Sequence, residues 1–157
     1  MSDAEVTSGI IEAGRFKKYV DTLLSLVAEC KIHFSDAGLH AQAVDPSNIS
    51  TFRKCDLKAS GFESFDSPGE VRIGVNLNKL SDYLNSANYD DLVEFGVDME
   101  TRTLNLRYRT VEHKMALIDP DAIRSDPDTP DLDLSNYVEI QSDHLKEARK
   151  NIELVTD

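Results

Sequence analysis

Histidine and cysteine are the side chains in this 157-residue chain whose types could do chemistry, and their spacing argues against catalysis. The four histidines, at positions 33, 40, 113 and 144, do not fall at ligand spacing, and there is no glycine-rich phosphate loop, GxSxG elbow or HExxH motif. His33 and His40 fall in an expected hairpin, where they are interpreted as ordinary surface or half-buried histidines. Cys30 and Cys55 lack CxxC spacing and are interpreted as reduced buried thiols, with disulfide, metal and redox roles as less favoured alternatives. We expect that the chain is not an enzyme and that it has no metal site and no cofactor.

Six aspartates lie between positions 118 and 134 and raise the question of a calcium site. A calcium loop of the EF-hand type needs a glycine at its sharp turn and a closing glutamate, and neither stands in register here. Solvated linker charge is therefore the favoured interpretation. A small enzyme that uses these aspartates with a metal remains the least favoured function.

The few cations of the chain are distributed on the polar faces of expected helices. Twenty-nine acidic residues against 17 basic ones give a net charge of -12, which excludes a simple basic nucleic-acid binder and opposes anionic membranes. A chain of this composition that works on DNA would have to gather its cations on one surface. Each helix alone is compatible with an ordinary solvated face. The helical cations are Lys17, Lys18, Lys79, Lys146, Arg149 and Lys150.

The elements that carry these residues follow from hydrophobic periodicity. Apolar residues at spacings of three and four predict a helix over residues 15–29 and a second, short helix that Asn76 caps. Gly38 supplies the positive φ of a tight hairpin turn. Alternating patterns predict strands over residues 6–11, 31–35, 39–45, 50–59, 71–75, 92–99, 103–109 and 111–117. Long antiparallel runs with two helices indicate an α+β fold in which both helices pack on one face of the sheet.

The composition changes after residue 117. Three prolines and six aspartates make residues 118–134 a predicted linker. Beyond it we expect a strand over residues 137–140 and a helix capped by Ser142, which repeats the strand-then-helix opening of the chain. The predicted organisation is therefore a complete domain over 1–117, the linker, and the beginning of a second domain over 135–157.

Three segments resemble the DNA sliding clamps of the proliferating cell nuclear antigen family, particularly its archaeal members. They are FKKYVDTLLSLVAECKIHFSDAGLHAQAVDPSNIS, IGVNLNKL, and MALIDPDAI followed by PDTPDLDL. The acidic composition resembles the clamps of salt-loving archaea. The resemblance implies a DNA clamp (processivity) fold, in which six domains close a ring with helices inside and antiparallel sheets outside, around duplex DNA.

The resemblance also implies which residues face DNA. In a ring of this kind, weak phosphate contacts without base reading allow sliding. Asp82 and Asn85 stand where the family often has lysine, so we expect a weaker hold on DNA that depends on low salt or bridging cations. The expected DNA-facing residues are Lys17, Lys18, Lys79, Arg149 and Lys150.

A second implied site is a hydrophobic pocket between a loop and the linker that holds short peptides of a DNA polymerase, flap nuclease, ligase or clamp loader. Thr129 stands where an apolar residue is usual, which weakens the linker side. Packing at a strand end is the alternative for Val44 and Ile49. The expected pocket residues are Val44, Asp45, Asn48 and Ile49 from the loop and Ile123, Pro127, Thr129 and Pro130 from the linker.

The strand over residues 111–117 resembles the clamp edge that pairs with the next subunit, through Val111, His113, Met115 and Leu117. A clamp subunit has two full domains, so this chain as written is not expected to close the three-subunit ring by itself. It would be a fragment, a divergent shortened clamp, or a chain that something else completes.

The expected function is that of a processivity ring, homotrimeric in its complete form, which tethers replication and repair proteins to duplex DNA. The alternative is a regulatory or decoy module that binds clamp partners without encircling DNA. No stretch is long and apolar enough to span a membrane, and the start MSDAEVTSG does not resemble a secretory signal, so an intracellular location is expected.

Overall fold

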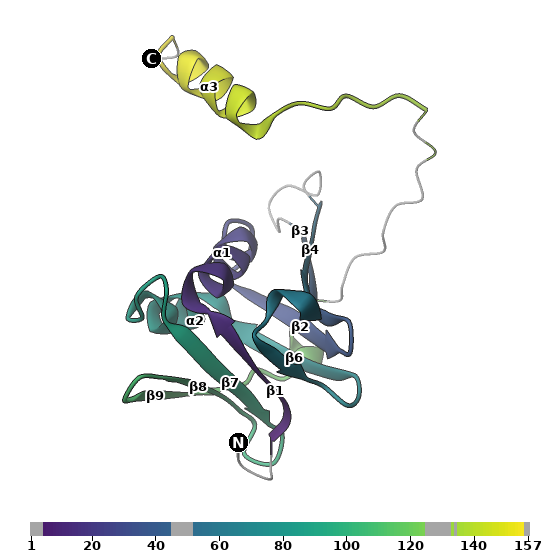
Figure 1. The fold of residues 1–157 in the computed structure, drawn as a ribbon. Helices are drawn as coiled ribbons and strands as arrows, with labels where there is room; N and C mark the ends of the chain where they lie inside the picture. Colours follow the sequence, from purple (N-terminus) through teal and green to yellow (C-terminus); the bar gives the residue numbers. More distant parts are fainter. Residues whose placement is uncertain (1–4, 45–51, 125–132, 134, 156–157) are drawn as a thin grey trace. The chain divides into compact units, whose positions relative to one another are not determined.

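The computed structural model describes residues 5–44, 52–124, 133 and 135–155. Its strands form two antiparallel sheets (Figure 1). In order across the five-stranded sheet lie β5 (Ser64–Asp66), β1 (Glu5–Glu12), β7 (Leu92–Asp98), β8 (Thr103–Tyr108) and β9 (Val111–Ala116). In order across the four-stranded sheet lie β4 (Phe52–Lys58), β3 (Gly38–Val44), β2 (Glu29–Ser35) and β6 (Val71–Asn76).

Two helices, α1 (Ala13–Leu24) and α2 (Leu77–Asn85), pack on each other and contact strands of both sheets. Helix α1 contacts β1 and β4, and α2 contacts β2, β6 and β9. Because each helix has an apolar face, this arrangement buries both faces in one core. The α+β fold with antiparallel sheets is thereby confirmed, and the structure adds the division into two sheets.

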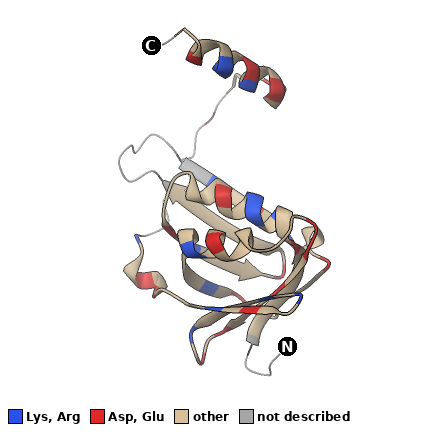
Figure 2. Ribbon diagram, turned by 90° about the vertical axis from the view of Figure 1, so that its left-hand side faces the viewer, with Lys and Arg blue, Asp and Glu red and all other residues tan. Residues whose placement is uncertain are grey.

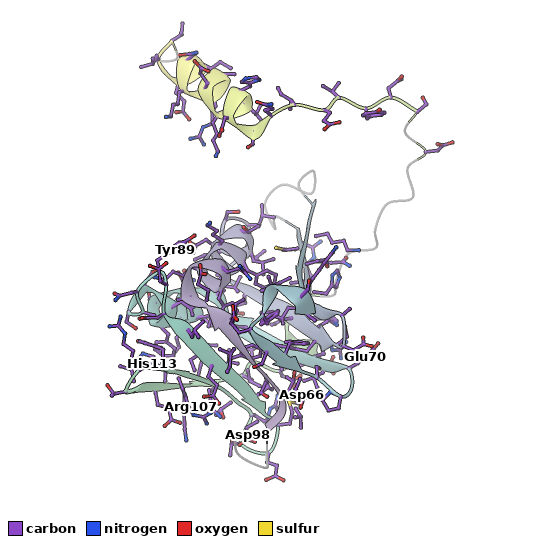
Figure 3. All side chains as sticks on the ribbon, viewed as in Figure 1. Asp66, Glu70, Tyr89, Asp98, Arg107 and His113 are labelled. Atoms are coloured by element: carbon purple, nitrogen blue, oxygen red, sulfur yellow. The ribbon has the colours of Figure 1, made fainter. Side chains whose placement is uncertain are left out.

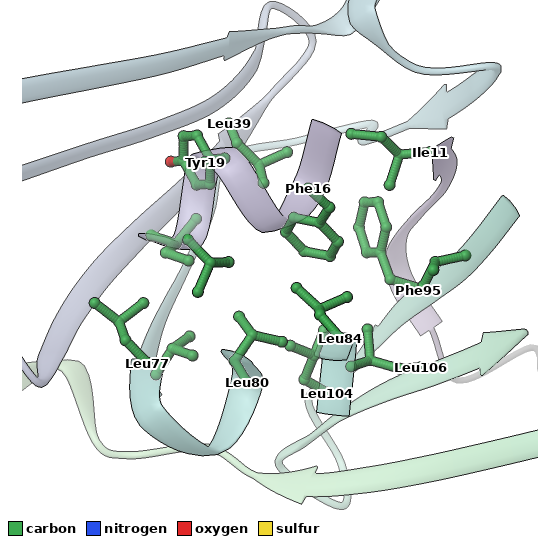
Figure 4. Packing of buried hydrophobic residues seen from close by; sticks show 14 of the residues in the cluster. Ile11, Phe16, Tyr19, Leu39, Leu77, Leu80, Leu84, Phe95, Leu104 and Leu106 are labelled. Carbon is green, nitrogen blue, oxygen red and sulfur yellow. The ribbon is translucent and has the colours of Figure 1, made fainter. Parts of the chain in front are cut away.

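Phe95 on β7 lies at the centre of the core and is fully buried. Its ring centroid is 6.0 Å from that of Phe16 on α1 and 6.0 Å from that of Phe34 on β2. Figure 4 shows Phe16 and Phe95 beside leucines of α2 and β8. One aromatic cluster therefore joins a helix to both sheets and fixes which face of the helix remains in water.

The predicted hairpin turn is present at Gly38, whose φ is 125°. A Cβ at this position would lie 2.1 Å from the carbonyl oxygen of Leu57 on the neighbouring strand, so only glycine fits. The predicted cap of α2 is also confirmed, since the Asn76 side chain accepts a hydrogen bond of 3.0 Å from the backbone N–H of Lys79.

Helix α1 ends at Leu24, earlier than the predicted limit of residue 29. The chain turns there, because the N–H groups of Leu26 and Val27 bond to the carbonyl of Leu23, at 3.0 and 3.1 Å, before β2 begins at Glu29. Val27 still packs against the core, so apolar spacing alone extended the helix too far.

The segment 60–68, which lies between two of the predicted strands, contains the short strand β5 just after a single 3-10 turn at Ala59–Gly61. Ser64 and Phe65 pair with Ile10 and Gly9 of β1. A strand of three residues is too short to show alternation, and only its pairing partner identifies it.

Tertiary contacts group Asp128–Asp157 as a unit separate from Met1–Pro127. It contains α3 (Ser142–Glu153), where Ser142, predicted as the cap, is instead the first helical residue and Gln141 is the N-cap without a side-chain bond. The predicted strand at residues 137–140 is wrong, because this segment finds no pairing strand within the described residues and Tyr137 and Val138 are 88% and 89% exposed. Among the described residues, none of the helices has the length and apolar character needed to cross a membrane.

Candidate nucleic-acid interface and peptide pocket

The exposed sides of α1 and α2 form one polar surface, which we call the helical face. The two helices are joined on it by the Ser81 hydroxyl of α2, which donates to the Asp21 carboxylate of α1 over 3.4 Å. Figure 2 shows basic and acidic positions interspersed on these helices, without a continuous basic stripe. Lys17, Lys18 and Lys79 lie on these helices together with Asp21 and Asp82, so the basic and acidic charges of this surface largely offset one another.

Lys17 is half-buried, and its Nζ donates to the carbonyl oxygen of Ala87 over 3.0 Å. Ala87 lies just after α2, so this bond ties the ammonium group of α1 to the chain that leaves the neighbouring helix. An ammonium group has three donors. The remaining two are available to water or to a phosphate.

Lys18 is exposed, and its Nζ lies 5.4 Å from the centre of the Tyr89 ring, at cation–π distance. A hydrogen bond with the Tyr89 side chain is the main cause that raises the pKa of Lys18 above its usual value of 10.5, so the amine stays charged. Tyr89, which is labelled in Figure 3, is half exposed. Its ring packs against Gly14 at the start of α1.

Lys79 repeats this arrangement on α2, with its Nζ 5.8 Å from the centre of the Tyr83 ring. Tyr83 stacks in turn on His113 of β9, with ring centroids 4.3 Å apart and planes within 5°. Neither tyrosine was among the predicted site residues. Tyr83 stands four residues after Lys79 on one helix, a spacing at which side chains meet, and that signal could have found it.

The cations of α3 belong to the separate unit Asp128–Asp157. Arg149 pairs with Glu153 over 3.4 Å, Lys146 pairs with Asp143 over 3.5 Å, and Lys150 is exposed. The expectation that Arg149 and Lys150 share one DNA-facing surface with α1 and α2 therefore stays a prediction.

Most of the expected peptide pocket falls outside the described residues. Val44 is the last residue of β3, and its backbone pairs with Phe52 of β4. The expected pocket residues outside the described part are Asp45, Asn48, Ile49, Pro127, Thr129 and Pro130. The geometry of this pocket is consequently a prediction as well.

The beginning of the predicted linker lies along β6. The Ile118 N–H donates to the carbonyl of Gly74 over 2.9 Å, and a side chain on Gly74 would meet the Ile118 carbonyl at 2.6 Å. Half-buried Ile123 lies over the same glycine, with its Cδ1 2.8 Å from where a Cβ would be. Asp121 accepts from the Arg72 guanidinium of β6 over 3.0 Å. The absence of a side chain at Gly74 thus lets the linker approach the sheet that carries Val44.

Strand β9 is the last strand of its sheet and pairs only with β8 among the described residues. Met115 is fully buried, Leu117 packs against the core, and Val111 is 38% exposed. The His113 ring stacks on Tyr83 of α2, and its Nε2 lies 3.1 Å from the Tyr108 hydroxyl of β8. The side chains of the predicted subunit edge therefore mainly support this domain, and pairing with another chain would use the backbone of β9.

The described part of the chain holds no cluster of three or more histidine, cysteine, aspartate or glutamate side chains arranged for a metal ion. Three aspartates of the expected acidic linker, Asp119, Asp121 and Asp133, are among the described residues. The Asp119 carboxylate caps a turn by accepting from the Asp121 N–H over 3.0 Å, and Asp121 forms the ion pair with Arg72.

Comparison with known proteins gives a consistent result. The family described as "Proliferating cell nuclear antigen, N-terminal domain" matches residues 4–123. The chain is 40% identical over 148 residues to the DNA polymerase sliding clamp of Natronomonas pharaonis and 39% identical over 148 residues to that of Halobacterium salinarum. Each alignment covers 94% of this chain and 59% of the relative, so the chain spans about three fifths of their length.

A solved structure, the C-terminal region of FEN-1 bound to A. fulgidus PCNA, matches with a TM-score of 0.77 and 37% identity. The match covers 82% of this chain and 51% of that one.

Proposed function

This chain belongs to the proliferating cell nuclear antigen family, and we propose that it acts as a DNA polymerase sliding clamp that turns its helical face toward duplex DNA. The observation that carries the proposal is the helical face, where α1 and α2 lie side by side and present Lys17, Lys18 and Lys79 to water. The proposed activity is non-enzymatic tethering inside the cell, and the proposed complete assembly is a homotrimeric ring.

The contacts of the three lysines support a loose hold on DNA. Each ammonium group lies at an internal partner: the carbonyl of Ala87 for Lys17, and the tyrosine rings for Lys18 and Lys79. These contacts hold the charges near the surface without aiming a planar donor pair at a base edge. Contacts of this kind, interspersed with carboxylates, favour sequence-independent and mobile binding.

The proposed peptide pocket lies between the end of β3 and the linker, and it would take a hydrophobic plug from a polymerase, flap nuclease, ligase or clamp loader. Support comes from the start of the linker, which packs on β6 through Ile118 and Ile123. In the related A. fulgidus structure, the C-terminal region of FEN-1 is bound. Burial of apolar side chains would supply most of the affinity.

The proposed ring contact is backbone pairing along β9, whose outer edge has no neighbour among the described residues. Light scattering after size exclusion separates this assembly from the alternative, a decoy module. In its complete form a clamp gives a stable trimer or larger particle, whereas a decoy remains a monomer.

The helical face is tested by Lys17→Glu combined with Lys18→Glu. We expect retention on duplex DNA at low salt to fall severalfold, because two attractive charges become repulsive where the local charge is nearly balanced. Binding of a flap-nuclease peptide should persist. The measurement is DNA retention in gel filtration together with calorimetry of the peptide.

The matched control is Lys54→Glu combined with Lys58→Glu, an equal charge change at exposed positions of β4. This control should retain more DNA than the α1 variant. An equal loss in both variants would contradict a DNA-facing role for α1, and loss of peptide binding in the α1 variant alone would indicate misfolding.

A further inference from the structure

The outward side of the four-stranded sheet carries a polar row that crosses all four strands. His33 of β2 lies directly opposite His40 of β3. The register continues the row to Asp56 on β4 and to Arg72 on β6. Ile32 and Phe34, which flank His33, are buried, so His33 alternates to the opposite face of the strand. The two histidines, which lie on successive strands, are thereby side by side.

The two imidazole rings are close enough to share one ion. Their centroids are 6.1 Å apart and their planes are inclined by 55°. Metal–nitrogen bonds of about 2.0–2.1 Å place the centroids of two ligating rings roughly 5 to 6.5 Å apart, depending on the angle at the metal. The observed separation of 6.1 Å falls within this range.

The hydrogen bonds of His40 place the ring in the state that ligates metals. Its Nδ1 contacts the Asp56 carboxylate, which can only accept, so Nδ1 carries the proton. Its Nε2 then has the lone pair, and it accepts from the Gln42 side-chain amide over 2.8 Å. A carboxylate behind the far nitrogen of a histidine is the usual support of a ligating imidazole.

We propose that His33 and His40 bind one divalent transition-metal ion of the zinc type, with Asp56 as the positioning residue of His40 and water in the remaining coordination positions. The Gln42 amide would give up its hydrogen bond to the incoming ion. Two imidazoles favour zinc, nickel or copper over magnesium or calcium, which prefer oxygen ligands. With two protein ligands the affinity should be modest, in the micromolar range.

The surroundings allow an ion to enter. Both histidines line one open pocket together with Ser35, Glu70 and Arg72. The Arg72 guanidinium would repel a cation, but it is paired with Asp121 over 3.0 Å, which offsets its charge. An ion bound between β2 and β3 would join the two arms of the hairpin beside β4.

The test is calorimetric titration of the full chain with zinc chloride. We expect one ion per chain at this site, and a loss of at least tenfold in affinity for His33→Asn and for His40→Asn. Asp56→Asn should weaken binding by roughly 10- to 100-fold, as for other carboxylates that support a ligating histidine. Magnesium chloride should give no comparable binding. His113→Asn and His144→Asn serve as matched controls and should bind zinc as the unmodified chain does.

Proton NMR supplies a readout that does not depend on a variant. Zinc should shift the imidazole resonances of His33 and His40 and leave those of His113 and His144 in place. Unchanged zinc affinity in both His33→Asn and His40→Asn, or shifts confined to the other two histidines, would overturn the proposal.

Discussion

At the scale of single residues, each of the three lysines of the helical face has a contact that holds its charge near the surface. Lys18 and Lys79 each lie over a tyrosine ring, at 5.4 and 5.8 Å, and Lys17 is held by a carbonyl. Long, flexible ammonium side chains lose rotamer freedom when they bind. Side chains already held near the surface would lose less on meeting a phosphate, which supports the proposed role of these lysines in a chain of net charge -12.

Ile49→Asp tests the peptide pocket at the residue that the family resemblance places in its loop. We expect the affinity for a flap-nuclease peptide to fall severalfold or more, because the change puts a charge into an apolar socket. Calorimetry measures the effect. Leu92→Asp is the matched control, since Leu92 is an apolar residue of β7 that is already 54% exposed. Equal affinity of the Ile49 variant and the unmodified chain would remove the pocket assignment.

Asp98 provides a prediction about pH. Its carboxylate accepts from the N–H groups of Glu100 and Thr101 in the turn between β7 and β8, at 2.9 and 3.0 Å, and the bond from Thr101 is the main cause that lowers its pKa below 3.8. A lowered pKa in the folded state means that this stabilisation is present above pH 3.8 and is lost as the pH falls through the folded value.

Asp98→Ala should therefore be less stable than the unmodified chain at neutral pH, and the gap should narrow as the pH falls below 3.8. Urea unfolding across a pH series measures this difference in the free energy of unfolding. Asp98→Asn keeps an acceptor for the turn, so its free energy of unfolding should lie between those of Asp98→Ala and the unmodified chain. A gap that stays constant down to pH 2 would contradict the assignment.

At the scale of elements, the features that depend on one residue type could be predicted from the sequence. The features that depend on pairing with a distant segment could not. Gly38 and Asn76 were predictable, because a positive φ and an N-cap each demand a particular side chain. Strand β5 was not predictable, because its three residues form a strand only by pairing with β1. The strand expected at residues 137–140 is absent, because this segment has no pairing partner within the described residues.

The candidate site followed the same division. Periodicity places Lys17, Lys18 and Lys79 on helix faces. The partners of Lys17 and Lys18, Ala87 and Tyr89, come from the chain after α2 and are fixed by tertiary packing, whereas Tyr83 lies four residues after Lys79 on the same helix. The pairing of His33 with His40 was within reach, because a turn centred before Gly38 sets the register of the hairpin. Motif spacing along the chain does not show this pairing, since it depends on the register across the two strands.

The cap of α2 gives a prediction at this scale. Asn76→Ala should lower the free energy of unfolding by about 1 kcal/mol, because the Lys79 N–H at the helix start loses its acceptor. Asn76→Asp, which retains the acceptor, should remain near the stability of the unmodified chain. Chemical denaturation measures both. Equal losses in the two variants would show that packing of Asn76, and not its cap, is responsible.

At the scale of the whole molecule, the proposed DNA-facing surface and the proposed metal site lie on different faces of the domain. The two sheets and the buried sides of α1 and α2 enclose the core, so the helical face and the outward side of the four-stranded sheet are separate surfaces of one domain. The acidic balance of the chain repels DNA at long range, and salt screens this repulsion within about 8 to 10 Å near physiological ionic strength. A clamp that encloses DNA topologically needs little affinity, which is compatible with a nearly neutral helical face.

The most direct test of this account is photo-crosslinking of the full chain to duplex DNA at low salt. A benzophenone amino acid is placed at Asn78, on the exposed side of α2, and in a second variant at Lys54, on the exposed side of β4. The account predicts crosslinks to the duplex from position 78 and few or none from position 54. Crosslinks from position 54 with none from position 78 would contradict the claim that α1 and α2 face DNA.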